Sequence, residues 1–339
     1  MRTLKIARST KLPLLATLFT AVACLGLAGC DDQAGDPKMQ IGAHPVLPAI
    51  QQYLMPPMRV AKVVGWGKDE TPGVAQGLQV HALATGFVHP RSLYVLPDGD
   101  VLVVESNGPK APIYRPKDII TGWVQWFAGA KAKDENRITL LRTNGDGPVQ
   151  RTVFLDHLNS PFGVALIGHD LYVANTDAIM RYPYQDGQTS ITAPGTKLTD
   201  LPGGPIDHHW TKALLASPDG SKLYVGVGSN SNIGENGVGA EYERAAIWEV
   251  DVASGSHRIF ASGVRNPTGL QWEPETGKLW AIANERDEIG PDLVPDYLTS
   301  VKDRGFYGCL TAITASTLTH ASYRSGPIWS RKRSRRTTR

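Results

Sequence analysis

Runs of strand-forming residues on either side of a short turn recur along the chain. The clearest copy lies within residues 211–228, where Ala213–Ala216 and Leu223–Val227 flank the turn Pro218-Asp219-Gly220. Apolar, aromatic and β-branched residues favour strands, and Pro, Asp and Gly favour the turn between them. This stretch therefore predicts a β-hairpin.

The same pattern starts at three other positions, namely Pro90, Pro161 and Pro267, whereas the first copy starts at Thr211. The starts are roughly fifty to seventy residues apart, a spacing that suits a four-stranded blade with variable loops. The sequence therefore predicts an all-β protein of the β-propeller class, with residues 78–308 forming the blades.

Polar residues stand one or two positions before the start of each repeat. Equivalent offsets place equivalent residues on the same rim, and a propeller arranges its blades around a central channel. We therefore expect five such side chains to converge on one axial pocket. They are His89, Asn159, His209, Arg265 and Asn266.

The N-terminus has the pattern of a bacterial export signal. Basic residues precede an apolar run from Leu12 to Leu27, which is short for a membrane span, and the run ends in Leu27-Ala28-Gly29-Cys30. These four residues look like a lipobox, so we expect residues 1–29 to be a signal peptide and Cys30 to be lipidated. The protein would then sit on the periplasmic side of the envelope, on the inner or the outer membrane. A buried helix or an uncleaved anchor is the alternative.

The segments on either side of the blades lack the repeat. Residues 30–77 are rich in Pro, Gly and Gln and predict a tether and lead-in, in which Met58–Gly67 could add a strand. Residues 113–142 are an insertion that could be a helix or a loop. Residues 309–339 hold seven basic and no acidic residues. We interpret this basic tail as out of frame or truncated, with the propeller incomplete; a basic arm is the alternative.

Charge and cysteine content argue against a nucleic-acid partner and against a disulfide bond in the body of the protein. The leader and the tail hold eleven of the 35 Lys and Arg residues, which leaves 24 against 32 acidic residues in the body. A body with a net charge near −8 argues against a nucleic-acid partner. Of the three cysteines, Cys24 lies in the leader, Cys30 is the expected lipid site and Cys309 lies in the tail, so no disulfide is expected in the body.

Three of the rim residues suggest a chemistry. His209 could act as a general base towards a substrate hydroxyl, because imidazole accepts protons near neutral pH. Arg265 offers a planar fork for a carboxylate, and Asn266 offers a donor and an acceptor beside it. The alternatives are a structural histidine and a salt bridge between blades.

These residues lie in motifs that carry a family resemblance. A His nine residues before Pro218-Asp219, together with the later Gly-Val-Arg-Asn-Pro-Thr-Gly at 263–269, resembles the soluble quinoprotein glucose/sorbosone dehydrogenases. Asn-Glu-Arg-Asp-Glu-Ile at 284–289 and Arg-Gly-Phe-Tyr-Gly at 304–308 are similar to that family's acidic loop and its Asn-Tyr-Gly-Trp-Pro segment. The closest similarity is to the sorbosone-dehydrogenase-like branch.

The resemblance implies a six-bladed propeller that binds pyrroloquinoline quinone (PQQ) and Ca²⁺. It implies oxidation of an aldose to a lactone, or of an aldehyde such as L-sorbosone to an acid, with electrons passing to an acceptor of the respiratory chain. His209 would be the base, and Arg265 and Asn266 would contact the quinone.

The chain departs from the family at several positions. His208 stands where the glucose enzymes have Asp, and Asn159 stands near the place of a Gln. Cys309 and Leu310 stand where Trp-Pro is expected, and the Lys and Arg pair of the later blades is missing. We expect His208, Asn159 and His89 to be further rim contacts.

Two other functions fit the same repeats. One is a calcium-dependent lactonase with oxygen ligands around a channel metal. Its ligands would be Asn175, Asp177, Asn284 and Glu285. The other is a non-catalytic envelope lipoprotein whose propeller binds a partner or a glycan.

Overall fold

The computed structural model describes residues 60–309, apart from 68–69, 111, 115, 130–134, 144, 146 and 288–293. The predicted signal peptide (1–29), the lipidation site Cys30, the tether up to residue 59 and the tail from residue 310 lie outside the described residues.

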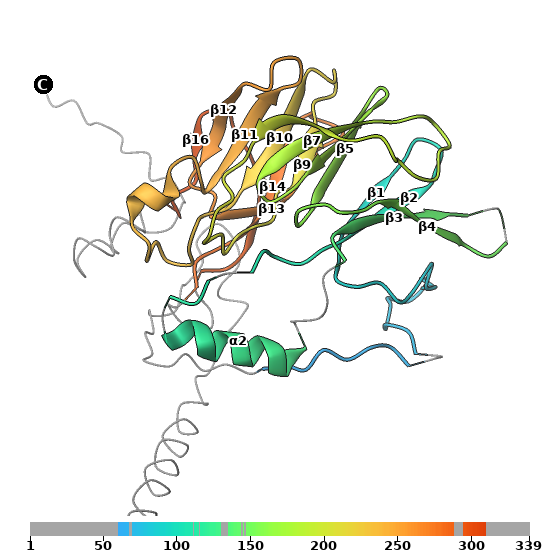
Figure 1. The fold of residues 1–339 in the computed structure, drawn as a ribbon, viewed down its shortest axis with the longest axis horizontal. Coiled ribbons are helices and arrows are strands. Elements are labelled where there is room, and N and C mark those ends of the chain that lie inside the picture. The colour runs from blue at the N-terminus through green and yellow to red at the C-terminus, as the bar shows by residue number, and fades with distance from the viewer. Residues whose placement is uncertain are drawn as a thin grey trace, which may run out of the picture. The chain divides into compact units, whose positions relative to one another are not determined.

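Four sheets follow one another along the described chain and are arranged as blades of a β-propeller (Figure 1). The all-β propeller prediction is confirmed, and the described residues form four blades; the count of six that the resemblance implied stays a prediction. The first blade contains β1 (Pro90–Val95), β2 (Val101–Glu105), β3 (Arg137–Arg142) and β4 (Gln150–Leu155). The second contains β5 (Gly163–Ile167), β6 (Asp170–Ala174), β7 (Ala178–Pro183) and β8 (Thr196–Asp200).

The third and fourth blades carry the residues of the predicted site. The third contains β9 (Leu214–Ala216), β10 (Lys222–Val227), β11 (Ala246–Asp251) and β12 (His257–Ser262), and β16 (Gly305–Phe306) pairs in parallel with β12. The fourth contains β13 (Asn266–Trp272), β14 (Leu279–Asn284) and β15 (Tyr297–Ser300).

Each predicted hairpin forms the first two strands of a blade. In the third blade, Tyr224 pairs with Leu215, and the Ser217 N–H donates to the Lys222 carbonyl at 2.9 Å. Gly220 closes the turn with a φ of +71°, which glycine adopts without the steric penalty of a Cβ. Local turn chemistry therefore sets the register of the strands.

Neighbouring blades share their cores. Three clusters of buried apolar side chains each join two consecutive sheets, as expected when sheets pack face to face. The first includes Val104, Ile138, Leu171 and Val173, the second Tyr172, Ile179, Leu223 and Trp248, and the third Tyr224, Ile247, Leu279 and Ala281. Between blades, the Trp272 Nε1–H donates to the Ala216 carbonyl at 2.7 Å.

The predicted insertion contains helix α2 (Pro116–Ala128), and a short 3₁₀ helix, η2 (Val238–Glu241), lies between β10 and β11. Residues 60–67 form no strand, but the Val63 N–H donates to the Ala128 carbonyl at 2.8 Å. No helix in the described part of the chain is long and apolar enough to cross a membrane. Cys309, the first residue of the predicted tail, is buried, and its N–H donates to the Gly263 carbonyl at 2.9 Å.

Candidate active site

The His209 imidazole is held against the strand that follows its own hairpin. Its Nδ1 lies 2.9 Å from the Ser229 carbonyl oxygen and 2.8 Å from Ser229 Oγ. The Ser229 hydroxyl donates its proton to the Ser231 carbonyl at 2.9 Å. Because a carbonyl only accepts and the hydroxyl proton is already used, Nδ1 carries the imidazole proton. The lone pair of the neutral ring is therefore on Nε2.

The electrostatic environment keeps His209 neutral. The side chain is only 9% exposed, and burial, followed by the positive charge of Arg265, lowers its pKa to about 3. Loss of solvation disfavours the charged imidazolium, and a nearby cation adds repulsion. An anionic group placed beside Arg265 would offset that repulsion and raise the pKa of His209 towards neutrality.

Arg265 and Asn266 lie next to His209 although more than fifty residues separate them in the sequence. The Ser229 N–H donates to the Arg265 carbonyl at 2.7 Å, and Thr211 Oγ1 donates to Asn266 Oδ1 at 3.4 Å. A Cβ on Gly228 would lie 2.4 Å from His209 Cβ and 2.8 Å from Asn266 Oδ1. The start of the fourth blade therefore packs against the His209 loop through a position where only glycine fits.

The Arg265 guanidinium is buried and ordered by backbone oxygens. Its Nε donates to the Asn232 carbonyl at 3.0 Å, and its Nη1 donates to the Glu285 carbonyl. Burial raises the pKa of the Glu285 carboxyl, which favours its neutral form beside this cation. The result is a fixed positive charge close to a neutral imidazole.

The other predicted rim residues are not joined to this group. Asn159 is exposed, and its carbonyl accepts from the Thr176 N–H at 3.1 Å. His89 is half-buried in the first blade, and its Nε2 is buried without a hydrogen-bond partner in the described structure. His208 is exposed, and its N–H donates to the Asn230 carbonyl at 3.1 Å. Within the described chain, no hydrogen bond links any of these three side chains to His209, Arg265 or Asn266.

A buried ion cluster beneath the His209 loop was missed by the sequence reasoning. The Asp207 carboxylate lies 3.2 Å from Lys212 Nζ and 2.6 Å from Arg244 Nη1, and it accepts a hydrogen bond from Thr176 Oγ1 at 3.1 Å. Asp207 and Lys212 have fully buried side chains. Asp207 and Lys212 lie at the two ends of the loop that carries His209, and the cluster connects this loop to Thr176 of the second blade and Arg244 of the third. The available signal was a lysine directly before an apolar strand, together with an aspartate five residues earlier.

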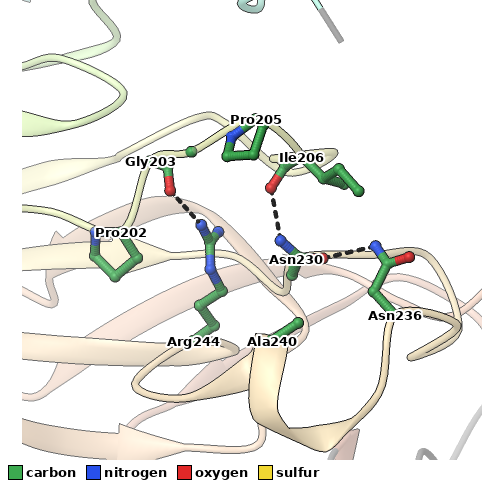
Figure 2. Close-up of a pocket in the computed structure, with 9 residues that line it drawn as sticks. Pro202, Gly203, Pro205, Ile206, Asn230, Asn236, Ala240 and Arg244 are labelled. Atoms are coloured by element: carbon green, nitrogen blue, oxygen red, sulfur yellow. Dashed lines mark hydrogen bonds between the residues drawn. The ribbon is translucent and has the colours of Figure 1, made fainter. Parts of the chain in front are cut away.

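A shallow pocket opens beside this cluster, and Figure 2 shows the side chains that surround it. Arg244 Nη2 donates to the Gly203 carbonyl at 3.0 Å, and Asn230 Nδ2 donates to the Ile206 carbonyl at 2.6 Å. Asn236 in turn donates to Asn230 Oδ1 at 2.7 Å. The pocket has a volume of about 370 Å³ and lies between the 202–206 segment and the loop after β10.

The ligands proposed for a lactonase metal lie in two separate places. Asn175 and Asp177 follow β6 in the second blade, whereas Asn284 is the last residue of β14 in the fourth blade and Glu285 follows it. Asn284 Nδ2 donates to Asp296 at 2.7 Å, and the Glu285 N–H donates to the same carboxylate at 2.9 Å. Among the described residues, no group of three or more His, Cys, Asp or Glu side chains could hold a metal ion.

Comparison with known protein families finds one family model that matches part of the chain. Residues 135–295, which include β3 to β14 and the residues of the His209 site, match the family model described as TrAA12-like. Over this range, which is less than half of the chain, the sequence is similar to that family. The match confirms the resemblance to the soluble quinoprotein dehydrogenases that the motifs indicated. No curated protein matches this chain.

Solved structures with the same fold extend the comparison. One is the holo form of the pyranose dehydrogenase PQQ domain from Coprinopsis cinerea, with 18% identity and a TM-score of 0.53 over 70% of this chain and 57% of that one. Another is the Trichoderma reesei carbohydrate-active enzyme of family AA12, with 17% identity and a TM-score of 0.54 over 70% and 59%. The matches confirm the propeller fold. This chain covers less than two thirds of either structure.

Proposed function

We propose that the protein is a sugar oxidoreductase of the quinoprotein type, with His209 as the general base. The observation that carries this proposal is the tautomer of His209, whose Nδ1 proton is committed to Ser229. The Nε2 lone pair is therefore available to a substrate hydroxyl. Support for a sugar substrate comes from the TrAA12-like match and from the pyranose dehydrogenase and carbohydrate-active enzyme structures that share the fold.

Each residue has a distinct part in the proposed reaction. His209 Nε2 takes the proton of the hydroxyl at the carbon that is oxidised, and Ser229 keeps the ring oriented while it does so. Burial lowers the pKa of His209 most, and the positive charge of Arg265 lowers it further, so Arg265 contributes to the proton affinity of the base. Asn266, fixed by Thr211 and packed on Gly228, presents an amide beside the base.

The donor set fits PQQ on the side formed by Arg265 and Asn266. PQQ carries carboxylates, and a buried guanidinium next to an amide suits an anionic planar group. When bound, the quinone supplies the hydride acceptor. A carboxylate beside Arg265 would also raise the pKa of His209 and so make it a stronger base. Ca²⁺ stays a prediction, and the described residues do not assign it a site.

Dye reduction by the full chain tests the proposal. Aldoses and L-sorbosone are supplied with and without PQQ and Ca²⁺, and lactone hydrolysis is measured in parallel. His209→Ala should reduce the dye-linked rate by about 10²–10⁴-fold, whereas His208→Ala, which alters an exposed neighbour, should keep most of it. Equal rates for wild type and His209→Ala would remove His209 from the reaction. Quinone-independent lactone hydrolysis would favour the lactonase, and inactivity in every arm would favour the binding lipoprotein.

We also propose that the protein works on the periplasmic side of the envelope, anchored by a lipid on Cys30 and passing electrons to a respiratory acceptor. The lipobox-like residues at 27–30 support this. Cells fed a labelled fatty acid should label the wild-type chain and leave Cys30→Ser unlabelled. Equal labelling of both proteins would refute lipidation at Cys30.

A further inference from the structure

Helix α2 presents an uncovered apolar face. Ile119, Ile120, Trp123, Trp126 and Phe127 follow the spacing i, i+1, i+4, i+7 and i+8, which places them on about a third of the helix circumference. All five are exposed, and Trp123 and Trp126 keep 62% and 67% of their surface. Burial of such side chains is strongly favourable, so a contiguous exposed group of them indicates a contact surface.

The lead-in extends this face. Val63, Val64 and Trp66 are also exposed, and the Val63 N–H bonds the carbonyl of Ala128 at the end of α2. Lys62 Nζ lies 5.0 Å from the centre of the Phe127 ring. We call these residues and the five on the helix the aromatic face. It combines tryptophans, whose rings have one apolar and one polar end, with a cation at its edge.

We propose that the aromatic face docks on the surface of an anionic lipid bilayer. Amphipathic helices with Trp and Phe on one side bind in this way at the boundary between headgroups and acyl chains. The helix has 13 residues, which is too short to span a bilayer. It would therefore lie in the plane of the interface.

The charge of the insertion agrees with an anionic surface. Residues 113–142 hold six basic and three acidic residues, whereas the body as a whole holds 24 basic and 32 acidic ones. The insertion is thus net positive in a negative protein. Basic residues near a bilayer are attracted to anionic headgroups, which would turn this side of the protein towards the membrane.

The expected lipid anchor at Cys30 would hold the aromatic face within reach of the bilayer to which the anchor is attached. Thirty residue steps separate Cys30 from Val60, which limits the distance between them to about 100 Å. An anchor of this kind holds the attached segment close to the bilayer, at a high effective concentration. The aromatic face would supply a second contact that does not depend on lipidation.

Vesicle binding by residues 31–339, which lack both the expected signal peptide and the expected lipid site, separates the face from the anchor. The probes are vesicles of phosphatidylethanolamine and phosphatidylglycerol at 3:1 and vesicles of phosphatidylcholine alone. The protein should sediment with the anionic vesicles, and Trp123→Gln combined with Trp126→Gln should weaken this binding about tenfold or more. Leu298→Gln, which changes an equally exposed apolar residue on β15, should bind as the parent does.

Three results would overturn the proposal. They are the absence of binding to anionic vesicles, equal binding of the tryptophan variant and its parent, and a lipid-free dimer that dissociates in the tryptophan variant. The last result would assign the face to a second copy of the chain. Because both tryptophans are exposed, circular dichroism of the variant should match the parent, and Lys62→Glu offers a second variant that should also weaken binding.

Discussion

Replacing Asp207 by Asn should destabilise the protein strongly, because two buried cations share its carboxylate. Lys212 Nζ and Arg244 Nη1 lie 3.2 Å and 2.6 Å from it, and none of the three side chains is more than 5% exposed. Removing one partner from a buried ion pair costs about 3–5 kcal/mol, since the remaining charge stays desolvated.

Lys212 limits this cost by losing its proton. Burial already lowers its pKa to about 8, while the charge of Asp207 acts in the opposite direction. Without Asp207 the pKa of Lys212 falls further, which favours the neutral amine and leaves Arg244 as the main buried charge. We therefore expect a loss of about 3–4 kcal/mol rather than the sum for two pairs.

Urea unfolding at pH 7 and 25 °C measures the loss. Lys197→Ala is the matched control, because Lys197 and Asp200 form an equally short ion pair of 2.6 Å with side chains that are 54% and 79% exposed. Exposed pairs contribute little, so the control should change the free energy of unfolding by no more than about 0.5 kcal/mol. A loss below about 1 kcal/mol in Asp207→Asn would show that solvent reaches the cluster.

Three further outcomes follow from the site and the core. The pKa of His209 is about 3 in the folded protein and near 6.5 when unfolded, so its contribution to stability is complete above pH 6.5 and is lost as the pH falls towards 3. His209→Gln should therefore lose less stability than wild type between pH 7 and pH 4 in urea unfolding, and equal losses would contradict this. Gly228→Ala places a Cβ 2.4 Å from His209 Cβ and should cost about 1–3 kcal/mol and most of the dye-linked rate, whereas Gly239→Ala, which meets no atom within 4 Å, should cost little; similar effects of the two would refute the close packing. Trp248→Ala empties a site that is 2% exposed and should cost about 3–5 kcal/mol in the same assay, and a loss below about 1 kcal/mol would contradict its place in the core.

The repeats were predictable because each hairpin is specified locally. Turn residues such as Pro218-Asp219-Gly220 stand between short apolar strands, and the structure forms β9 and β10 on either side. The insertion was assigned to a helix or a loop, and α2 lies within it. Its apolar stripe was not recognised, because an exposed and a buried stripe have the same spacing in sequence.

The site was predicted only in part. The position of a residue within its repeat indicates the blade on which it lies, but it does not indicate where its side chain points. His209, Arg265 and Asn266 come together since the third and fourth blades are neighbours and Gly228 lets them approach closely. Asn159 has a similar offset and yet is exposed. Asp207 and Arg244 were missed because their pairing crosses a long loop, and nothing in the local sequence distinguishes a buried carboxylate from a solvated one.

Single-turnover reduction of the quinone tests the central claim, that His209 accepts the sugar hydroxyl proton in an oxidoreductase. The full chain is loaded with PQQ, mixed with an aldose without oxygen, and followed by the absorbance of the quinone. We predict reduction by wild type, and a rate about 10²–10⁴-fold lower in His209→Gln with the quinone still bound. Equal rates for the two proteins, or a wild type that binds quinone and is not reduced by any sugar, would contradict the account.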